Sequence, residues 1–126
     1  MTIEVDTSAL FAALDRLGAS AEKHVKAAAK VTAERIEREA ERRIARRTGE
    51  TAKHVRVEET HDGLGYIVLS NNPGDRNHVD RYLEFGTAHM PAKPFFFISA
   101  ALEEGAHLRR VEQAVQAAID ETGLGA

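Results

Sequence analysis

Hydrophobic residues in the first part of the chain recur at the three- and four-residue spacing of one helical face. Asp6 or Thr7 can cap a short helix over about 7–18, because their side-chain oxygens accept free backbone N–H groups. A second, long helix is predicted over about 20–47, where no Gly or Pro occurs and Ala, Glu, Lys and Arg dominate. At about 1.5 Å per residue it would form a rod of about 42 Å, as long as a domain of this size is wide.

The pattern changes after Gly49 to the alternation of a half-buried strand. Strands are predicted over about 53–60 and 64–70, separated by the turn residues His61-Asp62-Gly63, which gives an antiparallel hairpin. Residues 71–77 carry several structure-breaking residues and are predicted to form a loop.

The last part of the chain returns to helical spacing. A short helix is predicted over about 78–85, with Gly86 as its left-handed cap. A C-terminal helix is predicted over about 94–122, because Pro94 is tolerated in a first helical turn. The predicted fold class is therefore α+β, with a long N-terminal helix, an antiparallel β-hairpin or small sheet, and a C-terminal helix packed on it.

Length and composition favour one soluble domain covering residues 1–126. The chain has no cysteine, so disulfides, thiolate metal sites and cysteine nucleophiles are excluded. No apolar run reaches the ~20 residues that span a bilayer, and the N-terminus lacks the features of a secretion signal. We therefore expect an intracellular protein without a membrane partner.

The residues that commonly carry catalysis do not converge in the sequence. The six histidines include no i,i+4 pair, and adjacent carboxylates such as Glu58 and Glu59 point to different sides. Ser70 and Ser99 have no base in register. We expect no catalytic residue, no metal site and no cofactor.

Charge is unevenly distributed. Residues 21–56 hold eleven Lys and Arg against six Asp and Glu, whereas the whole chain has a net charge of −3. The basic cluster comprises Arg42, Arg43, Arg46 and Arg47. Cations near a helix C-terminus often only complement the helix dipole. The functional alternatives are contact with DNA phosphates and a charge-complementary subunit interface, of which we favour the second.

The segment from Tyr82 to Phe97 has an unusual density of large apolar residues. Consecutive helical residues are rotated by about 100°, so the three phenylalanines at 95–97 cannot all face one core. We expect part of this segment to be covered by another subunit, since monomers rarely expose large apolar patches. The predicted interface residues are Tyr82, Glu84, Phe85, Gly86, Thr87, Met90, Pro91, Pro94, Phe95 and Phe96.

The same segment carries a family resemblance. Tyr82-Leu83-Glu84-Phe85-Gly86-Thr87, followed by Met90-Pro91-Ala92-Lys93-Pro94-Phe95 and an alanine-rich helix, resembles the tail-component family of long-tailed phages. That family is typified by the tenth gene product of HK97-type lambdoid phages. Thr48-Gly49 matches the family's Thr-Gly turn, so the resemblance covers about residues 20–115.

The resemblance implies a structural role in head–tail joining or tail completion, as a ring subunit of a phage, prophage or gene-transfer particle. The implied partners are further copies of the chain and other neck, head-closure, tail-tube or tail-terminator proteins. Contact of the ring with packaged DNA stays open. The implied location is the virion, after synthesis in the bacterial host cytoplasm. The alternative function is that of a small DNA- or RNA-binding protein that uses the arginine-rich helix.

Overall fold

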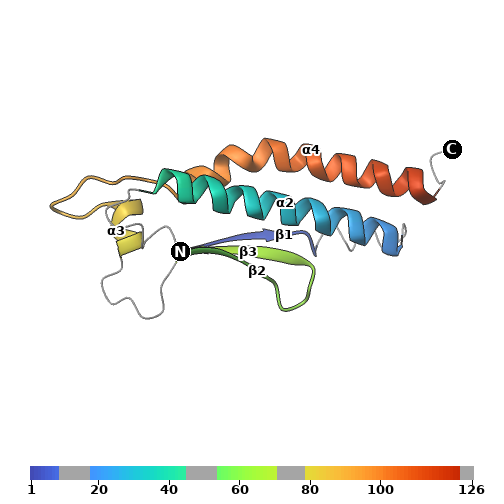
Figure 1. Ribbon diagram of the computed structural model, residues 1–126, viewed down its shortest axis with the longest axis horizontal. Coiled ribbons are helices and arrows are strands. Elements are labelled where there is room, and N and C mark those ends of the chain that lie inside the picture. Colours follow the sequence, from blue (N-terminus) through green and yellow to red (C-terminus); the bar gives the residue numbers. More distant parts are fainter. Residues whose placement is uncertain (9–17, 45–53, 71–78, 123–126) are drawn as a thin grey trace.

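The computed structural model describes residues 1–8, 18–44, 54–70 and 79–122 (Figure 1). Two long helices lie side by side above a small three-stranded antiparallel sheet, which confirms the predicted α+β class. The elements are β1 (Thr2–Asp6), α2 (Ala19–Arg43), β2 (Val55–Glu59), β3 (Gly65–Ser70), α3 (Val79–Phe85) and α4 (Phe97–Thr122). The predicted helix over about 7–18 and the predicted loop over 71–77 lie almost entirely outside the described residues.

Strand β1 is an element that the sequence analysis missed. It pairs with β3, and β3 pairs with β2, so the order is β1-β3-β2 with β1 and β2 at the edges. Ile3 and Val5 alternate with polar residues in the way a strand requires. Asp6 was instead expected to begin a helix, and its carboxylate does accept a hydrogen bond from the Ser8 N–H at 2.8 Å.

Helix α2 ends four residues before its predicted boundary near 47. Ile44 is extended, with φ −63° and ψ 136°, and its buried side chain packs into the core. A longer helix would place Arg46 and Arg47 one turn beyond Arg42 and Arg43, and like charges at i,i+4 repel. This repulsion and the burial of Ile44 both favour the earlier end.

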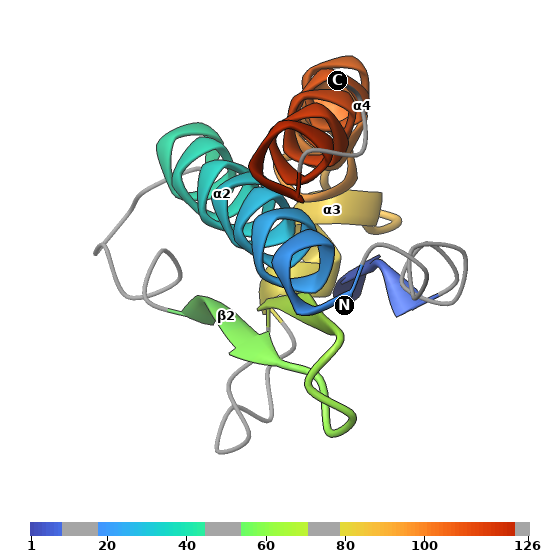
Figure 2. The ribbon, with the colours of Figure 1, turned by 90° about the vertical axis from the view of Figure 1, so that its right-hand side faces the viewer.

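The core lies between the inner face of α2 and the sheet. Ala29, Ala33 and Ile36 of α2 pack against Val68 of β3 and Val55 of β2. Small residues on α2 also let α4 approach closely, with Ala114 of α4 against Val25 and Ala28. Figure 2 shows the result end-on, with α2 nearer the sheet and α4 resting on α2 on the side of β1.

Candidate assembly surface

The Glu-Phe-Gly-Thr motif joins the end of α3 to the start of α4. Glu84, in the last turn of α3, is 6% exposed. Its Oε2 accepts hydrogen bonds from the backbone N–H groups of Phe95 and Phe96, both at 2.9 Å, and its Oε1 accepts one from Phe97 at 3.1 Å. A buried carboxylate therefore caps the N-terminus of α4, where free N–H groups and the helix dipole favour negative charge.

This cap corrects one expectation from the sequence and bears on a second. Helix α4 begins at Phe97 rather than near 94, and its first helical hydrogen bond runs from Ala100 N–H to the Phe96 carbonyl. Glu84 is a buried internal cap, so its side chain is not available to a neighbouring subunit.

Phe95 and Phe96 also lie inside the chain. Neither has exposed surface, and both pack in the main core. Neither side chain reaches the surface of the single chain, and a part for them in a subunit contact stays a prediction. The three phenylalanines do diverge as expected, because Phe97 stays 43% exposed.

Gly86 allows the chain to turn back from α3. Its φ is +75°, a conformation that L residues rarely adopt, and its N–H donates to the Tyr82 carbonyl at 2.8 Å. A Cβ on Gly86 would lie 2.8 Å from the Ala92 backbone nitrogen, so glycine is also required for space. The role of Gly86 as the left-handed cap is confirmed.

The remaining predicted interface residues lie nearer the surface. Phe85 is 65% exposed and Tyr82 is 46% exposed. Thr87, Pro91 and Pro94 are exposed, whereas Met90 is half-buried and pairs with Thr87 across the turn. These residues lie where a partner could reach them, and their role in a subunit interface stays a prediction.

The largest exposed apolar side chains gather along the first half of α4. We define the α4 patch as Phe85 of α3 together with Phe97, Ile98, Leu102 and Leu108 of α4, which are between 41% and 65% exposed. The rings of Phe85 and Phe97 are in contact, with their centroids 6.2 Å apart. Leu108 follows Phe97 after three helical turns, and Leu102 follows Ile98 after one, so the α4 members form one broad stripe.

The two faces of α4 differ in the size of their side chains, in the reverse of the usual order. The face against α2 uses small side chains, including Ser99, Ala114 and Ala118, which are buried. The larger leucine, isoleucine and phenylalanine side chains are on the solvent side. The interface residues predicted from the sequence include Phe85 but none of the α4 members of this patch. The helical spacing alone could have shown a second apolar stripe.

The described part of the arginine cluster is already paired with a carboxylate. Glu39 Oε1 lies 2.5 Å from Arg42 Nη2 and 2.7 Å from Arg43 Nε. Hydrogen bonds from Arg42, and then from Arg43, lower the pKa of Glu39. Arg46 and Arg47 lie outside the described residues. One carboxylate thus offsets part of the positive charge at this end of α2.

A buried Ser-Asp-His cluster resembles a catalytic arrangement only in its residue types. Asp80 accepts a hydrogen bond from the Ser70 hydroxyl, and its other oxygen lies 3.1 Å from His54 Nδ1. The carboxylate is thus between the other two groups, so the imidazole does not contact the serine as a general base would. Ser70 is 1% exposed and cannot meet a substrate. The cluster ties the ends of β2 and β3 to α3.

A second polar group crosses the interface between α2 and α4. Thr32 Oγ1 lies 2.7 Å from His107 Nδ1 and accepts a hydrogen bond from Arg110, which also donates to Glu103. Burial, and secondly the charge of Arg110, lower the pKa of His107, so the imidazole is neutral at pH 7. These contacts align the two helices.

Other kinds of site find little support in the parts of the chain that the structure describes. Within them, no three His, Asp or Glu side chains gather as metal ligands. None of the described helices has both the length and the apolar character needed to cross a membrane.

Comparison with known families gives one match. Residues 8–86 match the model of a family described as "Bacteriophage HK97-gp10, putative tail-component". The match spans well over half of the chain and ends at the glycine that closes α3. Searches of curated proteins and of solved structures found no match.

Proposed function

The chain belongs to the HK97 gp10-like family of bacteriophage tail components, and from this premise we propose that it is a ring subunit that joins heads to tails or completes the tail. Its role in the virion is structural rather than catalytic. Its partners are other copies of the chain and neighbouring neck, head-closure, tail-tube or tail-terminator proteins.

The α4 patch carries this proposal. A chain that stayed monomeric would bury more apolar area if the larger side chains of α4 faced α2 and its alanines faced solvent. An exposed apolar stripe of this kind is typical of a surface that is covered in an assembly. The stripe continues onto α3 through the contact between Phe85 and Phe97, so the segment with the family resemblance and the patch form one surface.

In a ring, one surface of each subunit contacts a different surface of the next subunit. Such heterologous contacts close into a ring when the rotation between subunits divides a full turn. Two helices of 25 and 26 residues, each about 38 Å long at ~1.5 Å per residue, offer long side faces for these contacts. The α4 patch is one face, and the basic end of α2 is a candidate for another.

The alternative, a nucleic-acid-binding protein, has weaker support. Arg42 and Arg43 share Glu39, so DNA phosphates would compete with an existing ion pair. A contact between subunits would meet the same competition, but the family match to a tail component favours it over a free nucleic-acid-binding protein. We therefore retain the interface role for the arginine cluster.

The proposal is tested by complementing a particle-forming phage or prophage that lacks this gene. Phe85→Asp and Leu102→Asp each place a charge on the α4 patch at an exposed position, so both proteins are expected to fold. Val31→Asp is the matched control, because Val31 is a 42% exposed apolar residue on α2.

We expect both patch variants to reduce the titre of infectious particles at least 100-fold, with unjoined heads and tails accumulating. Val31→Asp should restore the parental titre. Normal joining by both patch variants, with circular dichroism showing that they are folded, would refute the proposal.

A further inference from the structure

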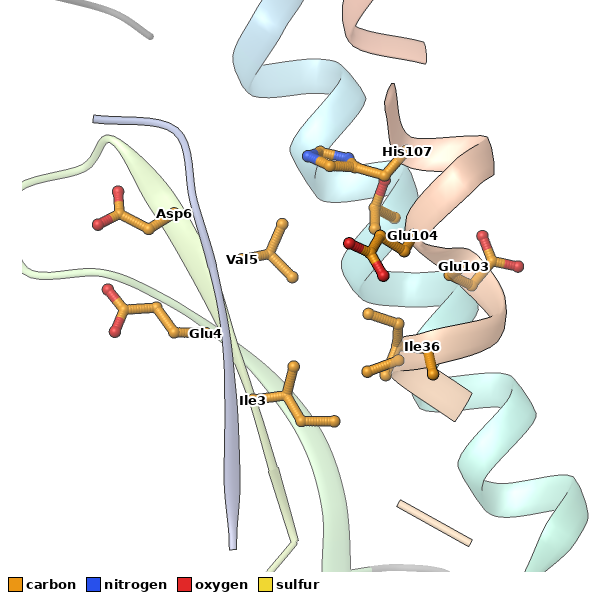
Figure 3. Close-up of a pocket in the computed structure, with 11 residues that line it drawn as sticks. Ile3, Glu4, Val5, Asp6, Ile36, Glu103, Glu104 and His107 are labelled. Atoms are coloured by element: carbon orange, nitrogen blue, oxygen red, sulfur yellow. The ribbon is translucent and has the colours of Figure 1, made fainter. Parts of the chain in front are cut away.

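A cleft separates the edge strand β1 from α4. Its volume is about 360 Å³, and its apolar floor includes Ile3, Val5, Ile36 and Ala100. Figure 3 shows Ile3 and Val5 pointing from β1 toward the helices, whereas Glu4 and Asp6 point away from them. Since Glu4 and Asp6 still line the cleft, they border it through their backbone.

The pairing of β1 fixes which backbone groups face this cleft. Met1 and Ser70 exchange two backbone hydrogen bonds, so Met1, Ile3 and Val5 bond to β3. In an antiparallel pair the residues in between turn their N–H and C=O groups to the opposite edge. The backbone of Thr2, Glu4 and Asp6 therefore presents a row of donors and acceptors on the side away from β3.

The other edge of the sheet is protected. Thr60 bonds to Gly65, so Val57 directs its N–H to the outer edge of β2 by the same alternation. Burial raises the pKa of the Glu37 carboxylate of α2 and the Val57 N–H lowers it, so this side chain lies against the outer edge of β2. A charged side chain turned onto an edge strand blocks the addition of a further strand. Of the two edges, β1 is thus the one suited to accept a strand.

Among the described residues, β1 pairs with β3 only, and its other edge borders the cleft. Helix α2 packs on all three strands, whereas α4 packs mainly on α2. The sheet has three strands, and α4 lies on the β1 side (Figure 2). A fourth strand would lie next to β1 with α4 above it.

The residues that line the cleft indicate which sequence an added strand would have. On the helix side, an added strand would meet Ile3, Val5, Ala100 and Ala101, which favours apolar side chains. On the opposite side its residues would lie beside Glu4 and Asp6, and opposite charges across strands attract. Glu104, an exposed carboxylate, lines the cleft on the α4 side. The matching sequence alternates apolar residues with Lys or Arg.

We propose that the cleft between β1 and α4 binds an extended segment of a different particle protein, with alternating apolar and basic residues, as a fourth strand of the sheet. This inference rests on the proposed function, since it names how the subunit holds a neighbour in the particle. Main-chain bonds to β1 supply affinity, and the alternation supplies specificity.

The first test uses the isolated full-length chain and a fluorescein-labelled peptide of five Lys-Val repeats, with five Glu-Val repeats as the control peptide. Glu4→Ala and Glu4→Pro are the matched variants. Both variants remove the carboxylate, but only proline also removes the backbone N–H of residue 4. This N–H points away from β3, so its loss breaks no bond to β3, and proline is tolerated on an edge strand.

Fluorescence anisotropy should show Lys-Val binding that is at least tenfold tighter than Glu-Val binding. Glu4→Pro should bind about tenfold or more weakly than Glu4→Ala. Hydrogen exchange should show the Glu4 and Asp6 amides protected by the Lys-Val peptide. Equal binding by both variants, or protection elsewhere only, would overturn the proposal.

The second test identifies the occupant in assembled particles. Because the chain has no cysteine, Glu104→Cys gives a unique attachment point for a short photo-crosslinker. Crosslinks to an extended segment of another particle protein support the proposal, whereas crosslinks only to copies of this chain, or none, overturn it.

The two proposals can fail separately. If Glu4→Pro joins heads to tails normally while Leu102→Asp does not, the strand addition fails and the assembly role stands. If the chain is absent from purified particles, the assembly role itself fails.

Discussion

The clearest quantitative prediction concerns the cap that Glu84 provides to α4. Replacing Glu84 by Gln keeps the shape of the side chain but removes its charge and turns one acceptor into a donor. That new NH₂ group would take the place either of Oε2, which accepts from Phe95 and Phe96, or of Oε1, which accepts from Phe97. At least one of these donors would then lose its partner.

The magnitude follows from the contacts. An unsatisfied buried donor costs about 1–3 kcal/mol, and loss of a negative charge at a partly buried helix N-terminus costs up to about 2 kcal/mol. We expect Glu84→Gln to lower the free energy of unfolding by about 2–3 kcal/mol. Glu84→Ala, which leaves all three donors without the carboxylate, should cost about 4 kcal/mol. These losses are a large part of the ~5–15 kcal/mol that holds a typical domain together.

Urea unfolding followed by circular dichroism measures this effect. With an m value of about 1.5 kcal/mol per M, a loss of 2 kcal/mol lowers the midpoint by about 1.3 M. Glu104→Gln is the control, because Glu104 is an exposed carboxylate on the same helix, and its change should stay within about 0.5 kcal/mol. A Glu84→Gln midpoint equal to that of the control would refute the capping argument.

Three further predictions concern other parts of the molecule. Gly86→Ala should destabilise the fold by about 2 kcal/mol or more in urea unfolding, because alanine is strained at φ +75° and its Cβ meets the Ala92 backbone; an unchanged midpoint would contradict this. The folded-state pKa of His107 is lowered, so the unfolded chain binds its proton more readily and stability should fall as the pH drops below about 6.5. His107→Gln should show a smaller loss between pH 7.5 and pH 5 than the parent, and an equal loss would exclude this group. Changing Arg42, Arg43, Arg46 and Arg47 together to Gln should leave the salt dependence of DNA association unchanged if the cluster serves a subunit interface, whereas a lower salt dependence would indicate phosphate contact.

Local patterns in the sequence predicted most of the elements. Strands β2 and β3 and helix α3 lie close to their expected positions, because alternation, turn residues and Gly86 are local signals. Strand β1 was missed because its alternation is only five residues long and it is stabilised by pairing with β3, whose paired residues lie 59 to 67 positions further along the chain. The early start predicted for α4 failed for a related reason, since its cap comes from Glu84 in another helix.

The candidate surface was only partly predictable. The sequence indicated that Phe85 and its neighbours exceed what one core can hold, and Phe85 is indeed the most exposed large apolar residue described. Periodicity cannot tell which of two apolar stripes on α4 faces α2. That choice depends on how closely the helices approach, and the close contact of alanines with α2 leaves Leu102 and Leu108 outside.

The most direct measurement is the accessibility of the α4 patch inside assembled particles. Single cysteines at Leu102→Cys and Val31→Cys are unique labelling sites in this cysteine-free chain, and both replace exposed apolar residues. A maleimide dye should label both variants equally in the free protein. In purified particles, we predict at least tenfold slower labelling at position 102 and unchanged labelling at position 31. Equal labelling at position 102 in the particle and in the free chain would contradict the claim that this surface is covered on assembly.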